Sequence, residues 1–193
     1  QSQPYNFTTI FIDSQDNVWL GTDDRGLYKT DAEFNILQHY YVNAPDGNTI
    51  SGNYIAAIEE DAEGNIWLAS LGNSVDFLAA DSASFIPYSK LGDPDFNGAT
   101  DEIRDIHSDN RKNIWFSTNH DGVYFRNADT HKITVIQHNA LDSSSLSSNA
   151  IHHIYEDKQG DFWLGSYRAG VNFLNSDMWK FTNYEALPES PNS

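Results

Sequence analysis

Apolar positions recur along the chain at a constant spacing of 48 residues. Each recurrence is centred on a tryptophan within one short phrase, written DNVWLGT, GNIWLAS, KNIWFST and GDFWLGS. An isoleucine stands nine residues before each tryptophan, and apolar residues stand twelve before it and eight after it. A fixed period is typical of one structural unit built several times, so the sequence predicts four copies of one unit. The repeated tryptophans are Trp19, Trp67, Trp115 and Trp163.

Each unit contains four short apolar runs separated by turn residues. The runs are rich in β-branched and aromatic residues and are bounded by Gly, Asn and Asp, which is typical of β-strands. A helical period is not sustained over three turns anywhere. In the third unit the expected strands cover residues 103–106, 114–118, 123–125 and 132–136.

A unit of four strands that is too small to bury its own apolar face is typical of the blade of a β-propeller. The sequence therefore predicts an all-β fold of four four-stranded blades, forming a partial ring or half-propeller. We expect one continuous domain over residues 1–193, because neighbouring repeats share their core. Its blades are expected near residues 5–52, 53–100, 101–148 and 149–193.

An aspartate lies six residues before each tryptophan, in a turn such as Asp61-Ala-Glu-Gly-Asn. A short acidic side chain in such a turn commonly accepts hydrogen bonds from nearby backbone N–H groups. Because a catalytic aspartate would not be needed once per blade, these residues are predicted to be structural, and the four tryptophans are predicted to be core. The aspartates are Asp13, Asp61, Asp109 and Asp157.

The composition of the chain limits the classes of partner that it can bind. The chain has 28 acidic and 11 basic residues and a formal charge of −17, which disfavours nucleic acid and anionic membrane surfaces. It has no cysteine, so disulfides and thiolate metal sites are excluded. Apolar runs fall well short of the roughly 20 residues that span a bilayer. We therefore expect membrane attachment only through segments of a parent protein outside this chain.

The phrase Ile-x-x-Ile-x-x-Asp-x-x-Gly-Asn-Ile-Trp-Leu-Gly-Thr, with its following Gly-Leu and its polar linker, resembles the two-component regulator propeller repeat. The resemblance is clearest over residues 55–70 and 151–166. It implies the extracytoplasmic, periplasmic sensor region of an inner-membrane hybrid histidine kinase of Bacteroides-type bacteria, which acts in a phosphorelay and responds to glycan-derived oligosaccharides. It implies no enzyme activity and no cofactor for this chain. The alternatives are a protein-docking scaffold and, less favoured, a lyase or glycosidase propeller.

The Pro/Ser-rich tail at 187–193 stands where earlier repeats have a linker, so we expect the chain to be a fragment of a longer protein. An incomplete ring leaves apolar blade faces at both ends. The sequence therefore predicts either a closed four-blade ring or a homodimer, with pairing favoured. Blade two departs most from the repeat, at Ala69, Ser74 and Asp76, and distorted outer strands are expected there.

The loops between the second and third strands of each blade change from repeat to repeat while the frame holds. Variable loops on a rigid scaffold are typical recognition sites, and these loops offer aromatic and donor groups suited to sugars. Solvated loops without a ligand are the alternative. The candidate ligand-binding residues are Asp23, Asp24, Arg25, Asn73, Asn119, His120, Asp121, Tyr167 and Arg168.

Three further features are assigned structural roles. Residues 93–104 resemble a calcium loop, with candidate ligands Asp93, Asp95, Asn97 and Asp101, but Arg104 stands where a bidentate glutamate is normal and the segment is an ordinary interblade linker. No metal site is therefore predicted. His152 and His153 are adjacent in a strand and should point to opposite faces. The fifth tryptophan, Trp179, aligns with Asn35, Ala83 and His131 and is expected to pack locally or against a missing neighbour.

Overall fold

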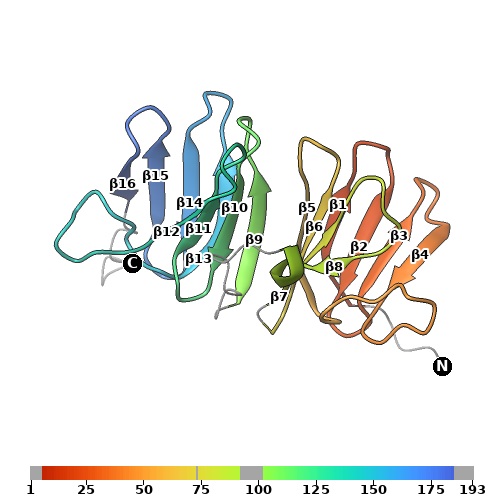
Figure 1. The fold of residues 1–193 in the computed structure, drawn as a ribbon. Helices are drawn as coiled ribbons and strands as arrows, with labels where there is room; N and C mark the ends of the chain where they lie inside the picture. The colour runs from red at the N-terminus through yellow and green to blue at the C-terminus, as the bar shows by residue number, and fades with distance from the viewer. Residues whose placement is uncertain (1–5, 73, 92–101, 185–193) are drawn as a thin grey trace.

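The computed structural model describes residues 6–72, 74–91 and 102–184, and within these ranges it contains sixteen strands and no α-helix (Figure 1). The expected all-β fold is confirmed. Each repeat forms one antiparallel four-stranded meander in which sequential strands are neighbours. The first sheet contains β1 (Phe7–Ile12), β2 (Val18–Thr22), β3 (Leu27–Thr30) and β4 (Ile36–Tyr40). The second contains β5 (Ile55–Glu60), β6 (Ile66–Ser70), β7 (Ser74–Leu78) and β8 (Ile86–Pro87), and the 3₁₀ helix η1 (Tyr88–Leu91) follows it.

The third sheet contains β9 (Ile103–Ser108), β10 (Ile114–Thr118), β11 (Val123–Arg126) and β12 (Ile133–Ile136). The fourth contains β13 (Ile151–Glu156), β14 (Phe162–Ser166), β15 (Val171–Asn175) and β16 (Lys180–Tyr184). The first strands β1, β5, β9 and β13 contact one another in sequence along the inner side of the arc. The upper edge of the arc in Figure 1, hereafter the turn rim, carries the turns after the first and third strands. The opposite edge, hereafter the loop rim, carries the loops after the second strands and the interblade linkers.

The repeated aspartate and tryptophan form one hydrogen-bonded unit in every sheet. In the first sheet the Asp13 Oδ1 atom accepts the backbone N–H groups of Gln15 and Asn17, at 3.0 and 2.8 Å. The Oδ2 atom of the same carboxylate accepts the indole Nε1–H of Trp19 at 2.8 Å. Burial alone would raise the pKa of Asp13, but the hydrogen bonds from Asn17 and Trp19 outweigh it and lower that pKa. The same indole bond measures 2.8, 2.8 and 3.0 Å at Asp61, Asp109 and Asp157.

Each of the first three indole rings packs against the sheet that follows its own. Trp19 lies edge-on to Phe85 of the second sheet, at 6.3 Å between ring centroids. Trp67 contacts Phe116 of the third sheet at 5.7 Å, and Trp115 contacts Phe162 of the fourth at 4.5 Å. These three side chains are 1, 2 and 1 % exposed. The core is therefore three interblade layers rather than one central cluster.

The arc has two uncovered ends. Trp163, at the repeated position in the last sheet, is 38 % exposed because no fifth sheet follows it. At the other end, Ile10 on β1 is 63 % exposed, whereas its equivalents Ile58, Ile106 and Ile154 are buried. Among the described residues, no contact comparable to those between successive sheets joins the first sheet to the fourth. The closed four-blade ring is therefore wrong, and so is a fully buried position for Trp163.

Blade two is the irregular one, as expected. Its fourth strand has two residues where the others have four or five, and η1 continues the chain from there. Glycines at the start of the third strand in the other blades, Gly26, Gly122 and Gly170, have φ of 77, 81 and 76°, which favours glycine. Ser74 takes that place in blade two, where it is the first residue of β7 and pairs with Ser70.

Replacing the same tryptophan in two repeats should cost very different amounts of stability. Trp115→Ala removes an indole buried between two sheets, and we expect the free energy of unfolding to fall by about 3–5 kcal/mol. Trp163→Ala removes a half-exposed indole, and a loss of about 1 kcal/mol is expected. Urea unfolding followed by circular dichroism, at a concentration where the chain is monomeric, measures both. Equal losses would contradict interblade packing of the indole.

Candidate functional site

The loop rim brings together some of the candidate residues. The imidazole Nε2 of His152 lies 3.3 Å from Asn119 Oδ1, joining β13 to the loop after β10. The His152 ring stacks on Tyr167, with 5.1 Å between centroids, and the Arg168 guanidinium lies 5.0 Å from the centre of the Tyr167 ring. Burial, Arg104 and the neighbouring His153 lower the pKa of His152, so its neutral form is favoured. Asn119, His152, Tyr167 and Arg168 therefore form one loop-rim cluster across the third and fourth sheets.

The candidates Asp23, Asp24 and Arg25 lie on another sheet, away from this cluster. Asp23 accepts a hydrogen bond from Asn6 at 2.9 Å, and Arg25 lies 3.6 Å from Asp24, all on the first sheet with the second sheet between them and the cluster. Asp121 accepts a bond from Tyr124 within its own blade. His120, beside it, is exposed. Asn73 and the calcium-loop candidates Asp93, Asp95, Asn97 and Asp101 lie outside the described residues.

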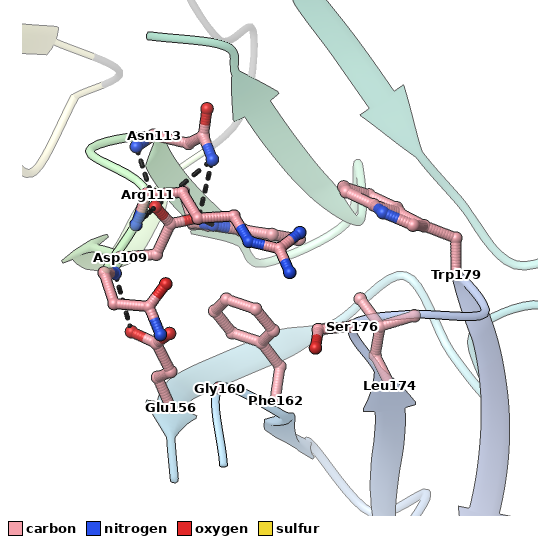
Figure 2. Close-up of a pocket in the computed structure, with 11 residues that line it drawn as sticks. Asp109, Arg111, Asn113, Glu156, Gly160, Phe162, Leu174, Ser176 and Trp179 are labelled. Carbon is pink, nitrogen blue, oxygen red and sulfur yellow. Dashed lines mark hydrogen bonds between the residues drawn. The ribbon is translucent and has the colours of Figure 1, made fainter. Parts of the chain in front are cut away.

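A hollow lies between each pair of sheets at the turn rim, on the side that sequence analysis did not select. Between the third and fourth sheets the hollow measures about 20 Å³, room for about one water molecule. Figure 2 shows why it is small: Trp179 and Phe162 line it, and Arg111 extends across it. The Trp179 ring stacks on Trp115 at 5.8 Å with an interplanar angle of 15°. Trp179 thus packs against Trp115 and Phe125 of the preceding sheet.

Between the second and third sheets the equivalent space is a cleft of about 410 Å³. Between the first and second sheets it is only about 60 Å³. One substitution within the repeat separates this cleft from both small hollows. Glu60 and Glu156 reach the turn of the preceding sheet in the small hollows, where they accept backbone N–H groups at 2.6 and 3.0 Å, but the third repeat has Ser108 at this position. It also has His131 at the position of Trp179.

The cleft is bordered by basic side chains. Arg126 Nε donates to the Tyr88 hydroxyl at 2.8 Å, and its guanidinium carbon lies 5.7 Å from the centre of the Trp67 ring. Lys112 Nζ lies 3.0 Å from Glu63 Oε1 across the mouth. The lining residues are Asp61, Glu63, Asn65, Trp67, Phe77, Lys112, Ile114, Arg126, Ala128 and His131.

Sequence reasoning missed this cleft, although the sequence carries a signal for it. Aligning the repeats shows that the third departs at Ser108, Lys112, Arg126 and His131, where the others favour other residue types. Each departure alone is unremarkable in a surface position. Only the structure shows that Lys112, Arg126 and His131 line one cleft together with Trp67 of the preceding repeat.

Two buried carboxyl groups lie deeper between the sheets. Glu59 on β5 accepts the Ser108 backbone N–H at 3.3 Å, and Asp105 on β9 accepts that of Ile154 at 2.9 Å. Burial raises the pKa of Glu59 to about 8, despite the Ser108 hydrogen bond. Burial also raises the pKa of Asp105, against the hydrogen bond from Ile154 and the nearby His153. Burial of these two carboxyl groups between blades therefore couples interblade packing to pH.

Comparison with known protein families finds one that the repeat resembles. Residues 2–24, 49–72 and 145–168 match the two component regulator propeller family. Three segments of the chain are therefore similar to two component regulator propeller repeats. The matched segments lie in blades one, two and four and cover the linker and first two strands of each. A comparison with curated proteins gives no match.

Solved structures share the propeller fold. The extracellular domain of BT4673 from B. thetaiotaomicron, assigned to a hybrid two component system, aligns with a TM-score of 0.72 at 22% identity, over 93% of this chain and 25% of that one. The extracellular domain of BT3049, from the same organism and assigned to the same class, aligns with a TM-score of 0.71 at 19% identity, over 93% and 24%. Virginiamycin B lyase from Staphylococcus aureus aligns with a TM-score of 0.68 at 15% identity, over 96% and 57%.

The propeller-repeat chain thus spans about a quarter of the length of the two sensor-system domains. The faces at the two ends of the arc, with Ile10 and Trp163, are exposed, whereas the equivalent faces inside the chain are covered by a neighbouring blade. The part of the chain that the structure describes contains no helix of the length and apolarity needed to cross a membrane.

The raised pKa of Glu59 predicts how stability changes with pH. Because the unfolded carboxyl ionises near 4.5 and the folded one near 8, the favourable contribution is present below pH 4.5 and is lost as the pH rises towards 8. Glu59→Gln should therefore reduce the fall in unfolding free energy across this window. Urea unfolding at both ends of the window measures it, with Glu63→Gln as the exposed control. A profile unchanged by Glu59→Gln would contradict the assignment.

Proposed function

We propose that this chain is the ligand-sensing, extracytoplasmic propeller part of a hybrid two-component sensor kinase. The observation that carries the proposal is the match of three segments to the two component regulator propeller family. The likeness to extracellular domains from B. thetaiotaomicron supports it through the shared fold. In this proposal the chain itself is not an enzyme, and it holds its ligand while the parent protein signals.

The proposed ligand is a glycan-derived oligosaccharide. The loop-rim cluster supports a sugar ligand, because Tyr167 presents an exposed aromatic ring and Arg168 presents hydrogen-bond donors beside it. Sugars are bound in proteins through such combinations of ring stacking and directed polar groups. The His152–Asn119 contact joins the third and fourth sheets, so a ligand bound at the loop-rim cluster can bias how these two blades sit.

Pairing of two copies through the uncovered end faces is the proposed route of relay. Trp163 at one end and the apolar surface around Phe7, Ile10 and Ile36 at the other have the same repeat positions as surfaces that pack together inside the chain. A homodimer would cover both kinds of surface. Solution scattering that shows a monomer at every concentration would contradict pairing.

The alternative functions are a docking scaffold and a lyase. The lyase alternative has one specific observation in its favour, the fold shared with virginiamycin B lyase. Incubation with an oligosaccharide panel and analysis of the products separates the lyase from the sensor, because a sensor returns the sugars unchanged. Binding of a protein partner without binding of any glycan would favour the scaffold.

Arg168→Ala should weaken oligosaccharide binding without changing the melting temperature. The side chain is exposed and its contact is with the neighbouring Tyr167 ring, so its loss should affect stability by less than about 0.5 kcal/mol. Calorimetric titration of the panel measures binding, and differential scanning calorimetry measures stability. Lys158→Ala, an exposed cation in the turn after β13, is the control that should leave both unchanged. Unchanged affinity in Arg168→Ala would remove the loop-rim cluster from the sensing site.

A further inference from the structure

The cleft between the second and third sheets has the dimensions of a ligand site. Small-molecule sites usually measure about 300–1,000 Å³, and this one measures about 410 Å³. The two equivalent hollows measure about 60 and 20 Å³, so the cleft is not a general consequence of propeller packing. It exists because the third repeat has the small Ser108 at the position where Glu60 and Glu156 reach across the two smaller hollows.

The acidic and amide groups of the cleft are already committed. Asp61 accepts the N–H groups of Glu63 and Asn65 and the indole of Trp67. The Asn65 side chain donates to Asp61 and accepts the backbone N–H of Ala80. These side chains form the turn and hold the indole, which leaves them little capacity for a ligand.

The side chains of the cleft that can still donate hydrogen bonds to a ligand are basic. Arg126 uses only its Nε atom, on Tyr88, and its two terminal nitrogens have no partner among the described residues. Lys112 has one partner, Glu63, in an exposed pair that a ligand can displace at little cost. The His131 ring has no hydrogen-bond partner in the described part of the chain. In a protein of charge −17, this collection of donors favours an anion locally.

We propose that this cleft binds a sugar-sized molecule through a carboxylate, held by Arg126 and Lys112. The planar guanidinium matches a carboxylate through two parallel hydrogen bonds, and its stem is already fixed by Tyr88 and Trp67. A singly charged carboxylate is preferred over a dianionic phosphate because Asp61 and Glu63 line the same cleft. An acidic sugar carries both required features, a carboxylate and a hydroxylated ring.

The assignment of a sugar rests on the sensing function proposed above, whereas the selection of a carboxylate rests on the cleft alone. The two are therefore separable. If an acidic monosaccharide binds through Arg126 but no oligosaccharide binds, the proposed carboxylate site stands and the proposed glycan-sensing function is contradicted. If oligosaccharides bind equally well to the wild-type chain and to the cleft variants, the glycan-sensing function stands and the carboxylate site is contradicted.

Two variants taken from the chain's own repeats test the site with little risk to folding. Arg126→Leu introduces the residue that the second and fourth repeats have there, Leu78 and Leu174. His131→Trp introduces the residue of the fourth repeat, and both backbone positions have the same left-handed φ, 58° at His131 and 51° at Trp179. We expect the new indole to lie over Trp67, as Trp179 lies over Trp115, and to fill the cleft.

Calorimetric titration with glucuronate, glucose and inorganic phosphate should show glucuronate binding most tightly to the wild-type chain. Arg126→Leu should weaken glucuronate binding by about tenfold to a hundredfold, the usual range for hydrogen bonds to a charged group. His131→Trp should abolish it while the melting temperature stays the same or rises. Arg111→Ala, which removes a cation from the small hollow on the same rim, should change nothing.

Three results would overturn the proposal. The first is that glucuronate does not bind, or binds no better than glucose. The second is that phosphate binds as tightly as glucuronate. The third is that a folded Arg126→Leu or His131→Trp variant, with a wild-type circular dichroism spectrum, keeps the wild-type affinity.

Discussion

The hydrogen bond from each indole N–H to the aspartate six residues earlier is the interaction on which the rest of the structure depends. It closes the turn between the first two strands and fixes the direction of the ring. The ring then lies across the gap and packs on the next sheet, so one side chain completes its own blade and joins it to another. Because the N–H group is satisfied internally, a large aromatic side chain can be buried without leaving an unpaired donor. Each of the first three repeated tryptophans therefore joins its own blade to the blade that follows it in the sequence.

Directional packing explains the two ends. A blade needs a successor for its tryptophan and a predecessor for the apolar face of its first strands. The first and last sheets each lack one of these, which is why Ile10 and Trp163 are exposed while their equivalents are buried. The same logic determines how much space each interface between blades leaves. Where a repeat supplies Glu60 or Glu156 the interface is closed, and where it supplies Ser108 the interface is open.

The fold could be predicted from the sequence because its determinants are local and repeated. Strand positions, turns and the order of blades all follow from residues within one unit of 48, and the structure confirms them. The cleft could not be predicted in the same way, because it is formed by what two different repeats leave unfilled. Its lining comes from Asp61 to Phe77 on one side and Lys112 to His131 on the other. The loop-rim residues were selected because they vary, but variation does not show which of them come together, as Asn119 and Tyr167 do through His152.

Hydrogen exchange of the five indole N–H groups, resolved by nuclear magnetic resonance, tests directly whether the tryptophans join successive blades. The account predicts slow exchange at Trp19, Trp67 and Trp115, which open only when blades separate, and faster exchange at Trp163, whose bond to Asp157 lies at an uncovered end. The exposed Trp179 should exchange fastest. Equal protection of Trp163 and Trp115 in a monomeric sample would contradict the account, because the bond within the turn would then be sufficient without a following sheet.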